Sequence, residues 1–140
     1  MCPGRPAVGR ADGRGYQTAL RERVLASVGM RRTTLVTEPS VLPDDRADGV
    51  TATGVQRDPW IGAGNLPAGV GVWSTAADMG RFVQQTMTGA APGASAARPR
   101  SRVTDDQRIG LGWFTDRTHD RTITWHNGAP GVLVVGGVRP

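Results

Sequence analysis

The stretch TITWHNGAPGVLVV, residues 122–135, constrains the fold more than any other part of this chain. Its first five residues alternate, with Ile123 and Trp125 on one side and polar side chains on the other, which is typical of a half-buried strand. The alternation stops at His-Asn-Gly, and an apolar run, VLVV at 132–135, follows a Pro-Gly pair. The pattern predicts two antiparallel strands separated by a glycine break, where a ligand or another backbone approaches closely.

A further strand is predicted just before this stretch. IGLGWF, residues 109–114, has strand-forming residues, and TDRTHDR (115–121) then connects it to the strand at 122–128 as a hairpin. Trp113 and Trp125 are interpreted either as a core pair across the two strands or as residues lining a substrate cleft.

The first predicted helix is YQTALRERVLASVGM, residues 16–30. Gly29 supplies a left-handed position after its last turn, and Met30 is expected to fold back on Leu25. The apolar residues fall on one helical face, namely Tyr16, Leu20, Val24, Leu25 and Val28.

The second predicted helix is STAADMGRFVQQTMTG, residues 74–89, and it ends at Gly89. Thr75 as N-cap and Asp78 three residues later have the spacing of a capping box, so Asp78 is interpreted as a cap and not as a catalytic acid. Ser74 is likewise interpreted as a hydroxyl of the cap region. The buried stripe is expected to contain Met79, Phe82, Val83 and Met87.

The remaining segments predict a chain rich in loops. Twenty Gly and ten Pro make up about a fifth of the 140 residues. Residues 31–72 are expected to form a long excursion with short strands, anchored by Trp60, and residues 90–101 a surface loop. The predicted fold class is α/β of the α+β type, a partial antiparallel sheet with flanking helices. The predicted organisation is an irregular tail at 1–14 and one partial domain at 15–140.

Charge and composition exclude several functions. The net charge is +5, but the seventeen basic residues, all Arg, are scattered, so no nucleic-acid groove is predicted. Two His without a helically spaced carboxylate, and a lone Cys2, predict no metal site and no cofactor. His119 and the pair Asp44-Asp45 are interpreted as solvated loop residues. No signal peptide or membrane span is visible, which predicts a cytoplasmic chain as written.

Three stretches in the same order resemble the serine β-lactamase and penicillin-binding-protein-like hydrolases, especially the class C and esterase branch. They are YQTALRERVLASVGMRRT, PAGVGVWSTAADMGRFV, and IGLGWF followed by WHNG. The resemblance covers residues 14–135 and implies the C-terminal portion of an incomplete β-lactamase/transpeptidase-like fold. Members of this family are often exported, and the intact enzymes act on small-molecule or peptide substrates.

The resemblance also implies roles for four residues, which we call the third-motif segment: His126, Asn127, Gly128 and Ala129. In the family this motif, Lys- or His-x-Gly, lies on an edge strand. From the residues alone, His126 is either a site residue or simply a histidine at a strand end. The resemblance implies that it occupies the cationic or hydrogen-bonding position of the motif and that Asn127 faces the substrate. Gly128 would let the substrate approach the backbone, and the Ala129 N–H would be one donor of the oxyanion hole.

Two motifs of the family have no counterpart in these 140 residues. The nucleophile motif Ser-x-x-Lys requires a Lys, and the sequence contains none. The motif Tyr-x-Asn is also absent, since the only Tyr, Tyr16, begins YQT and is interpreted as a core residue. No catalytic residue is therefore predicted. We expect a C-terminal fragment of a serine hydrolase that is inactive alone or, as the alternative, a non-catalytic binding module derived from that fold.

Overall fold

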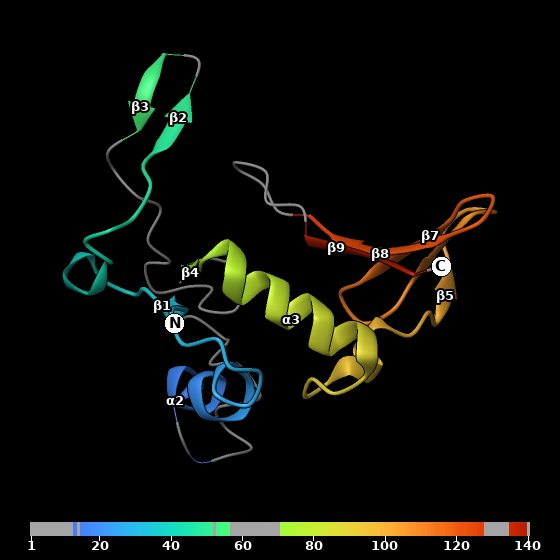
Figure 1. Cartoon of the computed structure of the whole chain (residues 1–140), viewed down its shortest axis with the longest axis horizontal. Helices are drawn as coiled ribbons and strands as arrows, with labels where there is room; N and C mark the ends of the chain where they lie inside the picture. Colours follow the sequence, from blue (N-terminus) through green and yellow to red (C-terminus); the bar gives the residue numbers. More distant parts are fainter. Residues whose placement is uncertain (1–12, 14, 52, 57–70, 128–134, 140) are drawn as a thin grey trace, which may run out of the picture. The chain divides into compact units, whose positions relative to one another are not determined.

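The computed structural model describes residues 13, 15–51, 53–56, 71–127 and 135–139 (Figure 1). The chain divides into two compact units, the first formed by Met1–Ala26 with Arg31–Thr75 and the second by Ser27–Met30 with Ala76–Pro140. Each unit is described separately. The predicted anchor Trp60, the tail residues 1–12 and Cys2 lie outside the described residues.

The first unit begins with a helix that changes its hydrogen bonding halfway. An α-helix, α2 (Tyr16–Leu20), continues as a π-helix, η1 (Arg21–Leu25), where the Ala26 N–H donates to the Arg21 carbonyl at 2.9 Å. The predicted stripe is only partly right. Leu25 and Val28 are buried as predicted, but Ala19 is buried as well, and Tyr16, Leu20 and Val24 are half-buried.

Among its described residues, the first unit also contains short strands, as the sequence predicts for residues 31–72. β1 (Thr34–Leu35) pairs antiparallel with β4 (Val72–Trp73), and β2 (Gly49–Thr51) pairs antiparallel with β3 (Gly54–Gln56). A 3-10 turn, η2 (Pro39–Val41), lies between β1 and β2.

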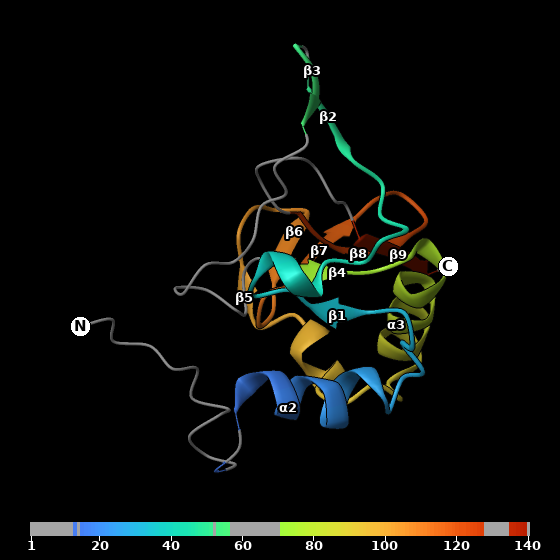
Figure 2. The ribbon, with the colours of Figure 1, turned by 90° about the vertical axis from the view of Figure 1, so that its left-hand side faces the viewer.

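Besides Ala19 and Leu25 of the helix, the buried side chains in the described part of this unit come from β1 and the residue after it. Leu35 and Val36 are buried, and the Val36 N–H donates to the Gly71 carbonyl at 2.7 Å. The Gln17 side chain of α2 donates to the Leu35 carbonyl at 3.3 Å, which ties the helix to β1. Figure 2 shows the ribbons of α2 and β1.

The second unit contains one long helix and one sheet. α3 (Ala76–Thr88) ends at Gly89, whose φ of 82° is the left-handed conformation expected at such a stop. The predicted helix is confirmed, but its most buried residues are Asp78 and Thr86, whereas Met79, Phe82, Val83 and Met87 are half-buried.

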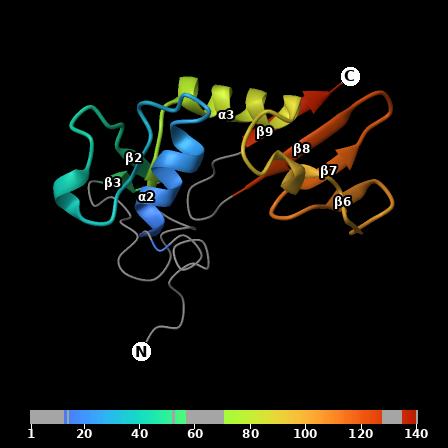
Figure 3. The same ribbon diagram turned by 90° about the horizontal axis from the view of Figure 1, so that it is seen from below.

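The sheet of the second unit has five antiparallel strands in chain order. They are β5 (Ser101–Arg102), β6 (Gln107–Ile109), β7 (Phe114–Arg117), β8 (Thr122–His126) and β9 (Val135–Arg139). Figure 3 shows α3 running alongside this sheet, next to β9. The predicted fold class, an antiparallel sheet with flanking helices, is confirmed.

Two strand boundaries differ from the prediction. IGLGWF is not one strand, because β6 ends at Ile109, a turn follows, and β7 begins at Phe114. The Gly110 N–H donates to the Trp113 carbonyl at 2.8 Å, and Gly112 has a φ of 76° that favours Gly. The strand predicted at 132–135 overlaps β9 only at Val135, and residues 132–134 lie outside the described residues.

The segment 90–101 is packed more firmly than a surface loop. It contains a 3-10 turn, η3 (Ala94–Ala97), and a buried residue, Ala91. The Leu111 N–H donates to the Ala96 carbonyl at 2.8 Å. A Cβ at Gly110 would lie 2.4 Å from that same carbonyl oxygen, so only Gly allows this close approach.

Candidate functional site

The third-motif segment begins at the end of β8. His126 is the last residue of this strand, and both His126 and Asn127 are exposed. Gly128 and Ala129, the other two predicted site residues, lie outside the described residues. The family motif implies that this strand lies at the edge of the sheet. In this structure it does not, because β8 lies between β7 and β9 and His126 pairs with Val135.

The strand register assigns side chains to the two faces of the sheet. Phe114 lies opposite Trp125, and Thr115 lies opposite Thr124. Since neighbouring residues of a strand point to opposite faces, Thr115 and Thr124 share one face and Phe114 and Trp125 share the other. Alternation would put His126 on the Thr124 face, but at this last residue of β8 its ring lies 6.4 Å from that of Phe114. Thr115 and Thr124 are buried at 5% and 7% exposure, which shows that this face is covered.

Aromatic rings meet at the same end of β8. The Phe114 and Trp125 rings stack with centroids 4.9 Å apart, and the Phe114 and His126 rings are 6.4 Å apart, each pair inclined by 27°. The predicted core pair of Trp113 and Trp125 is wrong, because the register places Phe114 opposite Trp125. Trp113 stacks instead on Phe82 of α3, at 6.1 Å.

One carboxylate links the three central strands. Asp116 of β7 accepts a hydrogen bond from Trp125 Nε1 of β8 at 2.7 Å and another from Gln107 Nε2 of β6 at 2.8 Å. All three residues are half-buried. Hydrogen bonds to an ionised carboxylate are stronger than those between neutral groups, so this contact fixes the orientation of the indole.

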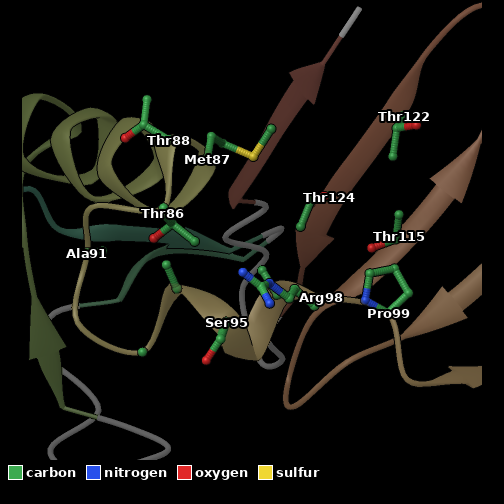
Figure 4. Close-up of a pocket in the computed structure, with 14 residues that line it drawn as sticks. Thr86, Met87, Thr88, Ala91, Ser95, Arg98, Pro99, Thr115, Thr122 and Thr124 are labelled. Atoms are coloured by element: carbon green, nitrogen blue, oxygen red, sulfur yellow. The ribbon is translucent and has the colours of Figure 1, made fainter.

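A cavity of about 580 Å³ lies on the Thr115 face of the sheet. Figure 4 shows its lining, in which Thr86 comes from the C-terminal part of α3, Arg98 follows η3, and Thr115 and Thr124 come from the sheet. The hydroxyls of Thr86 and Thr115 are buried and have no hydrogen-bond partner in the described part of the chain. His126 and Asn127 do not line this cavity.

The remaining titratable candidates lie elsewhere. His119 is exposed in the connection between β7 and β8, as predicted. Asp44 and Asp45 are exposed, and Asp45 forms an ion pair with Arg32. Among the described residues, no group of three or more His, Cys, Asp or Glu side chains is arranged to hold a metal ion.

Asp78 is the most buried acidic residue in the described part of the chain. It is 2% exposed and accepts a hydrogen bond from Arg81 Nη1 at 2.7 Å, one turn further along α3. Its place in the first turn suits an anion, because the helix dipole is positive there. This partner and place fit a structural role and not that of a catalytic acid.

Two hydroxyls from the sequence analysis lie in the first unit. Ser74 is exposed, and its Oγ lies 2.7 Å from Thr33 Oγ1. Tyr16 is half-buried in α2, and burial raises the pKa of its phenol above the usual value. The contacts of Phe114 and of the threonines around the cavity could not be predicted from the sequence, since they depend on strand register.

The family model described as Beta-lactamase matches residues 5–140. The chain belongs to the β-lactamase family. No curated protein matches it significantly.

Solved structures show the same fold. The penicillin-binding protein from Bacillus halodurans aligns with a TM-score of 0.64 and 14% identity, over 91% of this chain and 42% of its own. The D-amino acid amidase from Ochrobactrum anthropi SV3, in complex with L-phenylalanine amide, aligns with a TM-score of 0.52 and 21% identity, over 86% and 39%. The chain thus corresponds to about two fifths of the length of each, a partial match to the β-lactamase/transpeptidase fold.

No helix in the described ranges is both long and apolar enough to cross a bilayer.

Proposed function

We propose that this chain forms one side of a β-lactamase-family active site, and that the third-motif segment is the part that faces the substrate. The observation that supports this most is the exposed position of His126 and Asn127 where β8 ends. His126 would hydrogen-bond a substrate hydroxyl or carboxylate, and Asn127 would contact the substrate beside it. Gly128 would permit close approach, and the Ala129 N–H would donate to the developing oxyanion.

The family and one similar structure support a proposal for the substrate class. The intact family acts on β-lactams, D-Ala-type peptides or esters, and one similar structure is an amidase of D-amino acids in complex with an amino-acid amide. All of these molecules have a carbonyl carbon that is attacked by a nucleophile. We propose that this chain recognises a small carbonyl compound or peptide of this kind, and that residues 15–140 form one partial family domain.

We further propose that these 140 residues bind such a compound without forming a covalent intermediate. The sequence contains no Lys, so it has no Ser-x-x-Lys motif, and Tyr16 lies half-buried on α2 without the Asn of Tyr-x-Asn. Without an activated nucleophile, binding and oxyanion effects are what remain. As the alternative, the chain is a binding module derived from the fold. It would then also bind without a covalent intermediate, and its ligand would be any compound that fits the third-motif segment.

The experiment combines a covalent and a non-covalent measurement. A fluorescent penicillin is incubated with the chain, and intact mass is recorded; we expect no adduct, and a stoichiometric adduct would overturn the proposed absence of acylation. Binding of benzylpenicillin is then titrated by tryptophan fluorescence. His126→Ala should weaken binding about tenfold, the loss expected for one hydrogen bond to a charged group.

His119→Ala is the matched control, because His119 is the other histidine and is exposed in a loop. It should leave the dissociation constant unchanged. If both alanine variants bind as tightly as the parent chain, the third-motif segment does not contact this ligand and the proposed role of His126 is wrong.

A further inference from the structure

We propose that Phe114 is a positioning residue that holds the His126 imidazole in the orientation needed at the end of β8. This inference rests on the proposed function, since it is that function which gives His126 a role. Phe114 lies on β7, twelve residues before His126, and its ring is 6.4 Å from the imidazole at an inclination of 27°. Such spacing is within the range of stacked aromatic pairs.

Phe114 is itself held in place by a second ring. Trp125 stacks on it with centroids 4.9 Å apart and lies directly opposite it in the sheet. The indole cannot turn freely, because its Nε1 donates to Asp116 at 2.7 Å and Asp116 also accepts from Gln107 at 2.8 Å. The hydrogen bond to Asp116 therefore orients the indole, Gln107 holds Asp116 from the next strand, and the indole stacks on Phe114.

His126 has little else to fix its ring. It is exposed, it is the last residue of β8, and the described part of the chain shows no ion pair or side-chain hydrogen bond for it. An exposed side chain samples several rotamers. Each rotamer that cannot contact the ligand lowers the fraction of molecules that are ready to bind. A ring at 6.4 Å removes rotamers that would overlap it and favours those that stack.

The experiment uses NMR of the full 140-residue chain with labelled His and Phe, without any ligand. Cross-relaxation peaks are expected between the ring protons of Phe114 and His126. Phe114→Leu keeps an apolar side chain of similar reach but removes the ring. In this variant the His126 ring-proton shifts should move toward those of the exposed His119, and Phe114→Tyr should restore them.

Phe82→Leu is the control for general loosening of the unit, because it removes the other stacked pair, Phe82 on Trp113. The His126 shifts should stay in place in this variant. The proposal is overturned if the Phe114–His126 peaks are absent from the parent chain, or if both leucine variants move the His126 shifts equally. Should Phe114→Leu fail to fold, the cross-peaks of the parent and of Phe114→Tyr decide the matter.

These measurements separate the inference from the proposed function. The NMR readout requires no ligand, so the positioning of His126 is tested even where benzylpenicillin does not bind. Conversely, if benzylpenicillin binds through His126 but the ring contact is absent, the proposed function stands and the inference fails. With both correct, Phe114→Leu should weaken benzylpenicillin binding severalfold, and Phe82→Leu should not.

Discussion

Replacement of Thr115 by Val should stabilise the protein. Thr115 is 5% exposed on β7, and its hydroxyl has no hydrogen-bond partner among the described residues. A buried polar group without a partner costs about 1–3 kcal/mol of folding free energy. Val has the same branched shape and suits a strand at least as well as Thr. We therefore expect Thr115→Val to raise the free energy of unfolding by about 1–2 kcal/mol. For a chain of this size, each kcal/mol raises Tm by about 3–5 °C.

The assay is urea unfolding followed by tryptophan fluorescence, with Thr104→Val as the matched control. Thr104 Oγ1 accepts a hydrogen bond from the Gln107 N–H at 3.1 Å, so the same substitution should lower stability there, by about 0.5–1 kcal/mol. Thr86→Val, at the second unpaired hydroxyl, should behave like Thr115→Val. A loss of stability in Thr115→Val would refute the reasoning, because it would mean that this hydroxyl is hydrogen-bonded in solution.

Three further predictions follow from single contacts. Gly110→Ala should lower the free energy of unfolding by about 3 kcal/mol, since the new Cβ would lie 2.4 Å from a backbone oxygen. Gly80→Ala on α3, where a Cβ meets open space, should raise it by about 1 kcal/mol. Urea titrations of both variants check this. Trp125→Phe keeps a ring but removes the donor to Asp116, so the urea midpoint should fall by an amount equivalent to about 1 kcal/mol. Burial raises the pKa of Tyr16 above 10.0 in the folded state, because the buried phenol resists ionisation. The contribution of the neutral phenol to folding stability is therefore complete below pH 10 and is lost as pH rises through the folded-state pKa. Tyr16→Phe should flatten the decline in Tm between pH 9 and pH 11, and an unchanged decline would contradict this.

The sequence predicts α3 well because two independent signals agree on it. Apolar residues recur with helical spacing, and Gly89 marks the end, where its φ is indeed 82°. The helix that begins at Tyr16 has equally clear spacing, but this spacing does not indicate that Arg21–Leu25 form a π-helix. Local periodicity does not contain that information.

The turn at Gly110 was missed for a related reason. Isoleucine, leucine and tryptophan between glycines fit a strand as well as they fit a tight turn. The turn is chosen by a contact more than ten residues away, because the Ala96 carbonyl accepts the Leu111 N–H and leaves no room for a side chain at Gly110. Such a long-range contact cannot be inferred from strand propensity.

In the candidate site, too, the local sequence pattern predicts part of the arrangement, and long-range contacts decide the rest. Alternation alone places His126 at the end of a strand and Trp125 on the opposite side. The contact between His126 and Phe114 depends on the register of β7 with β8, and this register is set by the Thr118 to Arg121 turn, where the Thr118 N–H donates to the Arg121 carbonyl at 2.9 Å. A shift of one residue would have exchanged the two faces of the strand.

The position of β8 inside the sheet limits how a peptide can be recognised. β7 and β9 pair with β8 on its two sides, and β9 does so as far as His126. An extended peptide therefore cannot join this strand by edge-on addition, the mode in which main-chain hydrogen bonds supply affinity. A backbone N–H that binds a ligand at this end of β8 must therefore come from a residue after His126. Selectivity between ligands must come from side chains. In the described sheet, the strands with an open side are β5 and β9, so a peptide that binds by strand addition would do so away from His126.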